Sequence, residues 1–298
     1  MKIAVPIAAY EPGTTGEYVA RAFRQLDHQA DILNQWQFYT AFRERLYDLY
    51  FCVDSGGPLN LLSSETFDGP WEKLAFWMID YRRGKILKNP NDRDTCELIT
   101  RNGGWVFQSQ FEDFISCLDL ERVSWLPLAA DPDVWSDQPA EEKIYDVGFV
   151  GNVWDGTRQQ ILNDIRQSGL KLGWPGHGVA YMEAGARILR QSRIGFNVSS
   201  FWGEPIAYDV NMRVFETLSC GISLVTNHVP SLDKLFGPAR FVRGYRSNQI
   251  VQFLRSCLDS PNGFLETGQE AREWILGFGT YKLRMEQALS TLMEKRLW

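Results

Sequence analysis

The sequence has few residues that bind metals or form disulfides. It contains three histidines and five cysteines, all widely spaced, and neither a CxxC nor an HExxH motif. An odd cysteine count argues against a disulfide framework, and the spacing argues against a zinc site. We therefore predict no metal site and a reducing compartment, the cytoplasm. No apolar run approaches the roughly 20 residues of a membrane span, and the short apolar N-terminus fits a buried strand better than a signal peptide.

Positive charge is also scarce. The chain has 31 Lys and Arg against 37 Asp and Glu, a net charge of −6. Proteins that wrap DNA or RNA by bulk electrostatics are normally basic, so this class is disfavoured, although a local basic cleft stays compatible with an acidic total. Hydrophobic residues make up 44% of the 298 residues and aromatic residues 13%. At about 150 residues per domain, this composition predicts two globular domains with aromatic-rich cores.

Strands and helices alternate along the chain, which predicts parallel α/β sheets. The stretch 130–144 contains two prolines and five acidic residues and is the predicted linker. We therefore predict Rossmann-like domains at 1–135 and 136–298. In the first, strands are expected at 3–9, 49–53, 74–79, 105–107 and 123–129. One helix is expected to begin at a capping box formed by Thr14 and Glu17, and another to cover 36–48. In the second, strands are expected at 145–151, 170–173, 194–198, 222–226 and 239–242, with helices over 156–168 and 179–190, after Asn211, and from about 247 onward.

Ligands of open α/β folds bind at the carboxyl ends of the strands, so residues there are candidates for a site. In the first half, Asp80 follows an apolar strand and is our candidate general base, with Asp54 as a weaker one; a loop-capping role is the alternative for both. The turn before the first helix offers glycines and free N–H groups to a ligand, or serves only as a tight turn. Its residues are Gly13, Thr14, Thr15 and Gly16.

The second half carries more chemistry. Gly151 and Asn152 end a strand, and Arg158 lies in the first turn of the next helix, where a cation suits a bound phosphate or is simply solvated. Arg213 and Glu216, at i and i+3, share one helix face. They form either an intrahelical ion pair or a site for a diphosphate and a ribose. Other candidates at strand ends and in turns are His177, Asp209 and Thr226.

The segment from 211 to 226, Asn-Met-Arg-Val-Phe-Glu-Thr-Leu-Ser-Cys-Gly-Ile-Ser-Leu-Val-Thr, resembles the donor-site segment of GT-B glycosyltransferases. More narrowly, it is similar to the CgeB-like (spore maturation protein B-like) glycosyltransferase family. Segments 125–131, 145–152, 192–198 and 280–284 agree with that family in the same order. The resemblance covers about 125–290, whereas the first 120 residues match only by pattern.

The resemblance implies two Rossmann-like domains that face a central cleft, with C-terminal helices able to cross back to the first domain. It implies a nucleotide-sugar substrate, with a UDP-sugar favoured, and neither a tightly bound cofactor nor a metal. Glu216 would contact the ribose, and Arg158 and Arg213 the diphosphate, with Gly151, Asn152, His177 and Asn211 nearby. Many retaining enzymes of this fold carry an acidic residue eight positions before the ribose glutamate. Here Tyr208 stands there, beside Asp209, which leaves the stereochemical course open.

The sequence therefore predicts a hexosyltransferase that moves a sugar to a hydroxyl of a glycan, a small molecule, a protein or a modified DNA base. For the DNA base, a basic cleft would be required; the dense basic run at 82–88 is a candidate for it, or a solvated loop. Two alternatives stay open. One is a nucleotide-sugar epimerase or hydrolase of the same fold, which needs no acceptor. The other is a non-catalytic nucleotide-sugar-binding protein. The oligomeric state is not indicated.

Overall fold

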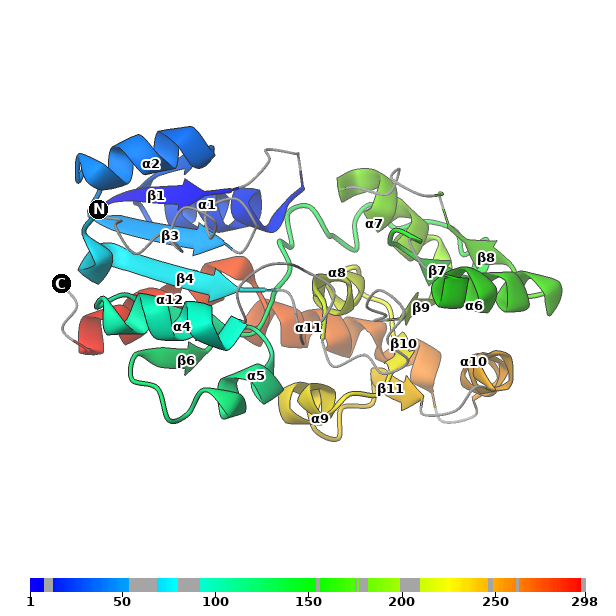
Figure 1. The fold of residues 1–298 in the computed structure, drawn as a ribbon. Helices are drawn as coiled ribbons and strands as arrows, with labels where there is room; N and C mark the ends of the chain where they lie inside the picture. The colour runs from blue at the N-terminus through cyan, green and yellow to red at the C-terminus, as the bar shows by residue number, and fades with distance from the viewer. Residues whose placement is uncertain are drawn as a thin grey trace. The chain divides into compact units, whose positions relative to one another are not determined.

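The computed structural model divides into two units, each built on one parallel sheet (Figure 1). Unit 1 comprises Met1–Pro127 and Tyr281–Trp298, and unit 2 comprises Leu128–Thr280. The structure describes residues 1–7, 13–53, 69–79, 92–153, 156–174, 176, 182–198, 210–245, 249–260 and 263–295. Within these residues, no helix is long and apolar enough to cross a bilayer, and no three His, Cys, Asp or Glu side chains gather to hold a metal ion.

The sheet of unit 1 has the strand order β2-β1-β3-β4-β5-β6, all parallel. Its order reverses between β1 and β3, which pair through Ile3 and Leu49. The strands are β1 (Lys2–Pro6), β2 (Gln29–Leu33), β3 (Leu49–Val53), β4 (Leu74–Met78), β5 (Trp105–Gln108) and β6 (Val123–Trp125). The helices are α1 (Thr15–Gln25), α2 (Gln35–Arg43), α4 (Asp92–Arg101), α5 (Phe111–Ser116) and α12 (Tyr281–Glu294), with a short 3₁₀ turn at Trp71–Lys73.

Aromatic side chains fill the core of unit 1, as the composition predicts. The ring of Phe51 on β3 lies 5.3 Å from that of Phe23 and 6.0 Å from that of Phe107. Tyr281, the first residue of α12, stacks on Tyr18 of α1 at 5.2 Å and meets Trp77 of β4 at 6.2 Å. These contacts place the last helix of the chain in unit 1, next to α1.

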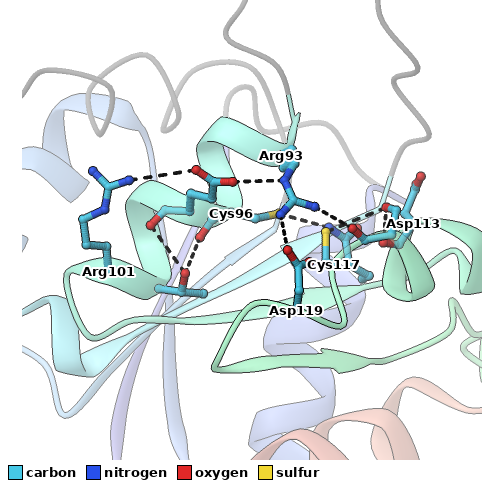
Figure 2. A network of polar contacts seen from close by, with 10 residues as sticks. Arg93, Cys96, Arg101, Asp113, Cys117 and Asp119 are labelled. Atoms are coloured by element: carbon cyan, nitrogen blue, oxygen red, sulfur yellow. Dashed lines mark hydrogen bonds and ion pairs between the residues drawn. The ribbon is translucent and has the colours of Figure 1, made fainter.

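A single arginine ties two helices of unit 1 together (Figure 2). Arg93 on α4 donates to the carbonyl oxygen of Ser116 at the end of α5, at 2.7 Å, and pairs with Asp119 at 2.6 Å. Its Nε atom also pairs with Glu97 one turn further along α4, at 3.0 Å. Because Arg93 satisfies a terminal carbonyl of α5, it stabilises the short helix at the end where cations are favoured.

The sheet of unit 2 has the order β11-β10-β9-β7-β8, again all parallel. Its strands are β7 (Tyr145–Phe149), β8 (Leu172–Gly173), β9 (Ser192–Asn197), β10 (Leu224–Asn227) and β11 (Val242–Tyr245). Its helices are α6 (Gly156–Gln167), α7 (Met182–Arg190), α8 (Met212–Ser219), α9 (Pro230–Phe236), α10 (Ile250–Leu258) and α11 (Gly268–Phe278), with a 3₁₀ turn at Phe264–Thr267.

Several sequence-based expectations need correction. The edge strand β2 was not predicted, because its five residues, Gln-Ala-Asp-Ile-Leu, form no continuous apolar run and only Ala30 and Leu33 are buried. The expected strand at 239–242 lies instead at Val242–Tyr245, and the helix expected over 36–48 ends at Arg43. The capping box is wrong as well: Glu17 accepts the N–H of Gly13 at 2.7 Å, and the Thr14 hydroxyl caps nothing.

The two units also divide the chain differently from the domains proposed at 1–135 and 136–298. Unit 2 begins at Leu128. The reason is that the predicted linker packs on unit 2: Ser219 on α8 donates to the carbonyl oxygen of Trp135 at 2.6 Å, and Lys143 donates to that of Arg190 at 2.7 Å. The stretch predicted to be the linker is therefore held on unit 2 at Trp135 and Lys143.

Helix α11 meets the end of α8 at a glycine. A Cβ atom on Gly268 would lie 2.1 Å from the carbonyl oxygen of Gly221, a backbone atom that has little freedom to move. We expect Gly268→Ala to lower the free energy of unfolding by about 1–3 kcal/mol through overpacking. Gly277 on the same helix has open space around its Cβ position, so Gly277→Ala should raise it by roughly 0.5–1 kcal/mol. Urea unfolding tests both, and equal stabilities would contradict this packing.

Candidate functional site

The carboxyl edge of the unit 2 sheet contains a topological switch point. Strand β7 continues through α6 to β8 on one side, and β9 continues through α8 to β10 on the other. The connections that leave the adjacent strands β7 and β9 therefore diverge. In open α/β sheets this divergence forms the crevice where ligands bind.

Arg158 spans this switch point. Its Nη2 atom donates to the carbonyl oxygen of Val198, just past β9, at 3.0 Å, and its Nη1 atom donates to that of Asn152, just past β7. Arg158 lies in the first turn of α6, where the helix dipole disfavours a cation. The structure thus fixes a guanidinium at the predicted place, between the ends of the two strands.

Gly151, Asn197 and Thr226 also lie at this edge. The carbonyl oxygen of Gly151 accepts the indole N–H of Trp174 at 3.3 Å. The Asn197 amide at the end of β9 donates to the Thr226 hydroxyl on β10 at 3.0 Å, and both side chains are buried. These contacts hold the ends of neighbouring strands in register. They place the predicted residues Gly151, Asn152 and Thr226 at the same edge as Arg158.

Tyr245 is a residue at this edge that the sequence reasoning missed. It ends β11, its ring stacks on that of Phe196 at 6.0 Å, and its buried hydroxyl has no hydrogen-bond partner among the described residues. Burial raises the pKa of the phenol, and the positive charge of Arg158 acts in the opposite direction. An aromatic residue at the end of a strand could have indicated Tyr245. It was missed because the strand was expected three residues too early, at 239–242.

Helix α8 begins as predicted. Asn211 is its N-cap, and its Oδ1 atom accepts the backbone N–H of Arg213 at 3.1 Å. Arg213 and Glu216 share a face and form an ion pair, with Nη1 2.5 Å from Oε2. The intrahelical ion pair, one of the two readings left open by the spacing, is therefore present in this structure without a ligand.

The environment of this ion pair is asymmetric. Glu216 is 0% exposed, and its Oε1 atom has no hydrogen-bond partner within the described part of the chain. Burial raises the pKa of this carboxyl, and Arg213 opposes the shift. A buried carboxylate oxygen without a donor is costly, so Oε1 is an acceptor suited to a ligand hydroxyl.

The predicted turn of unit 1 is explained by packing. Gly13 adopts a φ of 82°, which favours glycine, and a Cβ atom on Gly16 would lie 2.1 Å from the Cγ2 atom of Ile7. Glycine at position 16 thus lets α1 pack closely against the end of β1, with Thr14 and Thr15 opening the helix. Asp54, Asp80, His177 and Asp209 lie outside the described residues.

Two parallel α/β units with a final helix that returns to the first unit form the GT-B fold, and comparison with solved structures confirms this class. HepE from Anabaena, solved with UDP, has a TM-score of 0.70 at 12% identity, covering 99% of this chain and 100% of its own. An alpha-glucosyltransferase (AGT) solved with UDP has a TM-score of 0.63 at 10% identity, covering 98% and 100%. Sucrose-phosphate synthase from Thermosynechococcus elongatus has a TM-score of 0.65 at 10% identity, covering 99% of each chain.

The family follows from the sequence of unit 2 and the start of α12. Residues 138–290, just over half of the chain, match the model of the family described as glycosyl transferase-like. The chain belongs to this glycosyl transferase-like family. A search of curated proteins gives no match.

Proposed function

We propose that this protein is a hexosyltransferase that takes its sugar from a UDP-sugar bound by unit 2. The observation that carries the proposal is the buried Glu216 carboxylate, which has one oxygen paired with Arg213 and the other without a donor among the residues that the structure describes. A ribose hydroxyl would supply that donor. Solved proteins of the same fold, HepE among them, were crystallised with UDP or UDP-glucose.

The diphosphate of the donor would meet fixed positive charge. Arg158 at the switch point and Arg213 in the first turn of α8 are the proposed partners, together with the N–H groups at the two helix starts. Guanidinium groups and helix dipoles can stabilise a leaving diphosphate without a metal ion, so we propose metal-independent transfer. The narrower CgeB-like assignment is part of this proposal.

The acceptor side is proposed to lie with unit 1. Asp80, which follows β4 in the sequence, remains our candidate for the base that takes a proton from the acceptor hydroxyl. The solved proteins of this fold include an alpha-glucosyltransferase in complex with DNA and AviGT4, a glycosyltransferase involved in Avilamycin A biosynthesis, so the fold alone does not select an acceptor.

A thermal-shift panel tests the donor. We expect UDP at 100 times its dissociation constant to stabilise the protein by about 2.7 kcal/mol, which corresponds to a rise in Tm of several degrees. ADP and GDP are the ligands for comparison with UDP. EDTA should not abolish the rise in Tm that UDP causes. If no nucleoside diphosphate raises Tm, the proposal is wrong. If UDP-sugar is consumed at full rate in water alone, hydrolysis replaces transfer as the reaction.

A further inference from the structure

Trp135 is buried in unit 2 although it lies in the stretch that composition marks as a linker. Its side chain is 1% exposed. Its backbone is held on both sides: its N–H donates to the carbonyl oxygen of Asp131 at 2.8 Å, and its carbonyl oxygen accepts the Ser219 hydroxyl at 2.6 Å. The indole ring therefore has a fixed position relative to α8, the helix that carries Ser219.

The ring fills the space between two helices. On α7, a Cβ atom on Gly185 would lie 2.8 Å from the edge of the indole, so the ring packs directly on the backbone of this helix. On α8, the guanidinium carbon of Arg213 lies 5.3 Å from the ring centroid. This distance is within the range of a cation–π interaction, for which tryptophan is the best partner.

The contact with Trp135 is compatible with a further polar partner for Arg213. The Arg213 side chain is 18% exposed, and among the described residues only its Nη1 atom has a side-chain partner, Glu216. A cation–π contact is not a hydrogen bond to an acceptor oxygen, so an anion can still accept the other N–H groups of the guanidinium. The contact also restricts the side chain before a ligand arrives, so less conformational freedom is lost on binding.

We infer that Trp135 is a positioning residue that holds Arg213 for the diphosphate of the donor. This inference rests on the proposed function, since it assigns a partner to a side chain of the same site. The ion pair with Glu216 occupies Nη1, so a phosphate can accept the other N–H groups of Arg213 while the ion pair and the contact with the indole stay in place. Trp135 itself touches no substrate in this role and acts only through Arg213.

A double-mutant cycle tests the role, with UDP and uridine as ligands in calorimetric titrations. We expect Trp135→Leu to weaken UDP binding about tenfold and to change uridine binding less than twofold, because uridine has no diphosphate. Trp135→Phe keeps an aromatic face and should stay within about threefold of the wild type for UDP. In an Arg213→Met background, Trp135→Leu should change UDP affinity less than about twofold.

The outcomes distinguish a failure of the proposed function from a failure of the role of Trp135. If the wild type binds no nucleoside diphosphate, the proposed function fails and this role fails with it. If UDP binds but the two substitutions are additive, or uridine affinity falls as much as UDP affinity, the role of Trp135 alone is overturned. Should Trp135→Leu not fold, Gly185→Ala replaces it in the cycle, since its methyl group would displace the ring from Arg213 without removing it.

Discussion

Glu216→Ala is expected to weaken UDP binding about 10- to 100-fold, because a hydrogen bond to a charged group contributes about 1.5–3 kcal/mol. The carboxylate is fully buried on α8, and Oε1 has no donor among the described residues until a ligand brings one. The loss should appear in titrations with UDP and with uridine, since both contain the ribose. Glu286→Gln on the exposed face of α12 is the control and should leave both affinities unchanged.

Glu216→Gln separates this binding role from folding. Burial raises the carboxyl pKa above its ordinary value of 4.5, so the folded protein keeps this proton to a higher pH than the unfolded chain does. Below pH 4.5 the carboxyl is protonated in both states. Above it the unfolded chain ionises first, so the free energy of unfolding of the wild type falls as pH rises until the folded carboxyl ionises too. Without ligand, Glu216→Gln should therefore gain stability relative to the wild type between pH 4.5 and 7.

These two variants make the ribose assignment easy to refute. If Glu216→Ala is folded and binds UDP as tightly as the wild type, Glu216 has no part in the donor site. If Glu216→Gln is instead strongly destabilised at pH 7, the ion pair with Arg213 is a structural element whose charge the fold requires. Urea unfolding of the ligand-free proteins at pH 4.5 and pH 7 distinguishes this case from a loss of binding.

Arg190→Met is expected to lower the free energy of unfolding by about 1–3 kcal/mol, since it removes a buried guanidinium whose acceptors then lose their donor. The Arg190 side chain is 2% exposed and pairs with both Glu141 and Glu183. It also donates to the carbonyl oxygen of Ser136 at 3.2 Å. These bonds hold the segment that connects Trp135 to β7 against the end of α7.

Arg187→Met is the matched control, because Arg187 lies on the same helix and pairs with the same Glu141 at 3.4 Å but is 64% exposed. An exposed pair of this kind contributes about 0.2–1 kcal/mol, so the control should be only slightly less stable than the wild type. Urea unfolding measures the difference. If both substitutions have the same small effect, the segment 136–143 is held by something other than Arg190.

The sequence predicts the features of this site that depend on local spacing. Asn211 as an N-cap, the shared face of Arg213 and Glu216, and the location of Arg158 in the first turn of a helix all follow from positions along one element. Each is present in the structure. Local spacing could not decide between an ion pair and a ligand site, because that depends on how deeply tertiary packing buries Glu216.

Trp135 and Tyr245 show the opposite case. Trp135 lies in a stretch whose proline and acidic residues indicate a linker, and its burial results from contacts with α7 and α8, more than 45 residues away in the chain. Tyr245 ends a four-residue strand whose one partner strand among the described residues is β10. Short strands and bound connections acquire their positions from the rest of the sheet, so their own residues carry little information about them.

The return of α12 to unit 1 has a consequence for synthesis on the ribosome. Unit 2 is continuous in sequence and complete at Thr280, whereas unit 1 lacks a helix until the residues after Thr280 have been made. Until then, the ring contacts of Tyr281 with Tyr18 and Trp77 cannot form. The unit that emerges first is thus the last to be completed, and its aromatic core depends on the final helix of the chain.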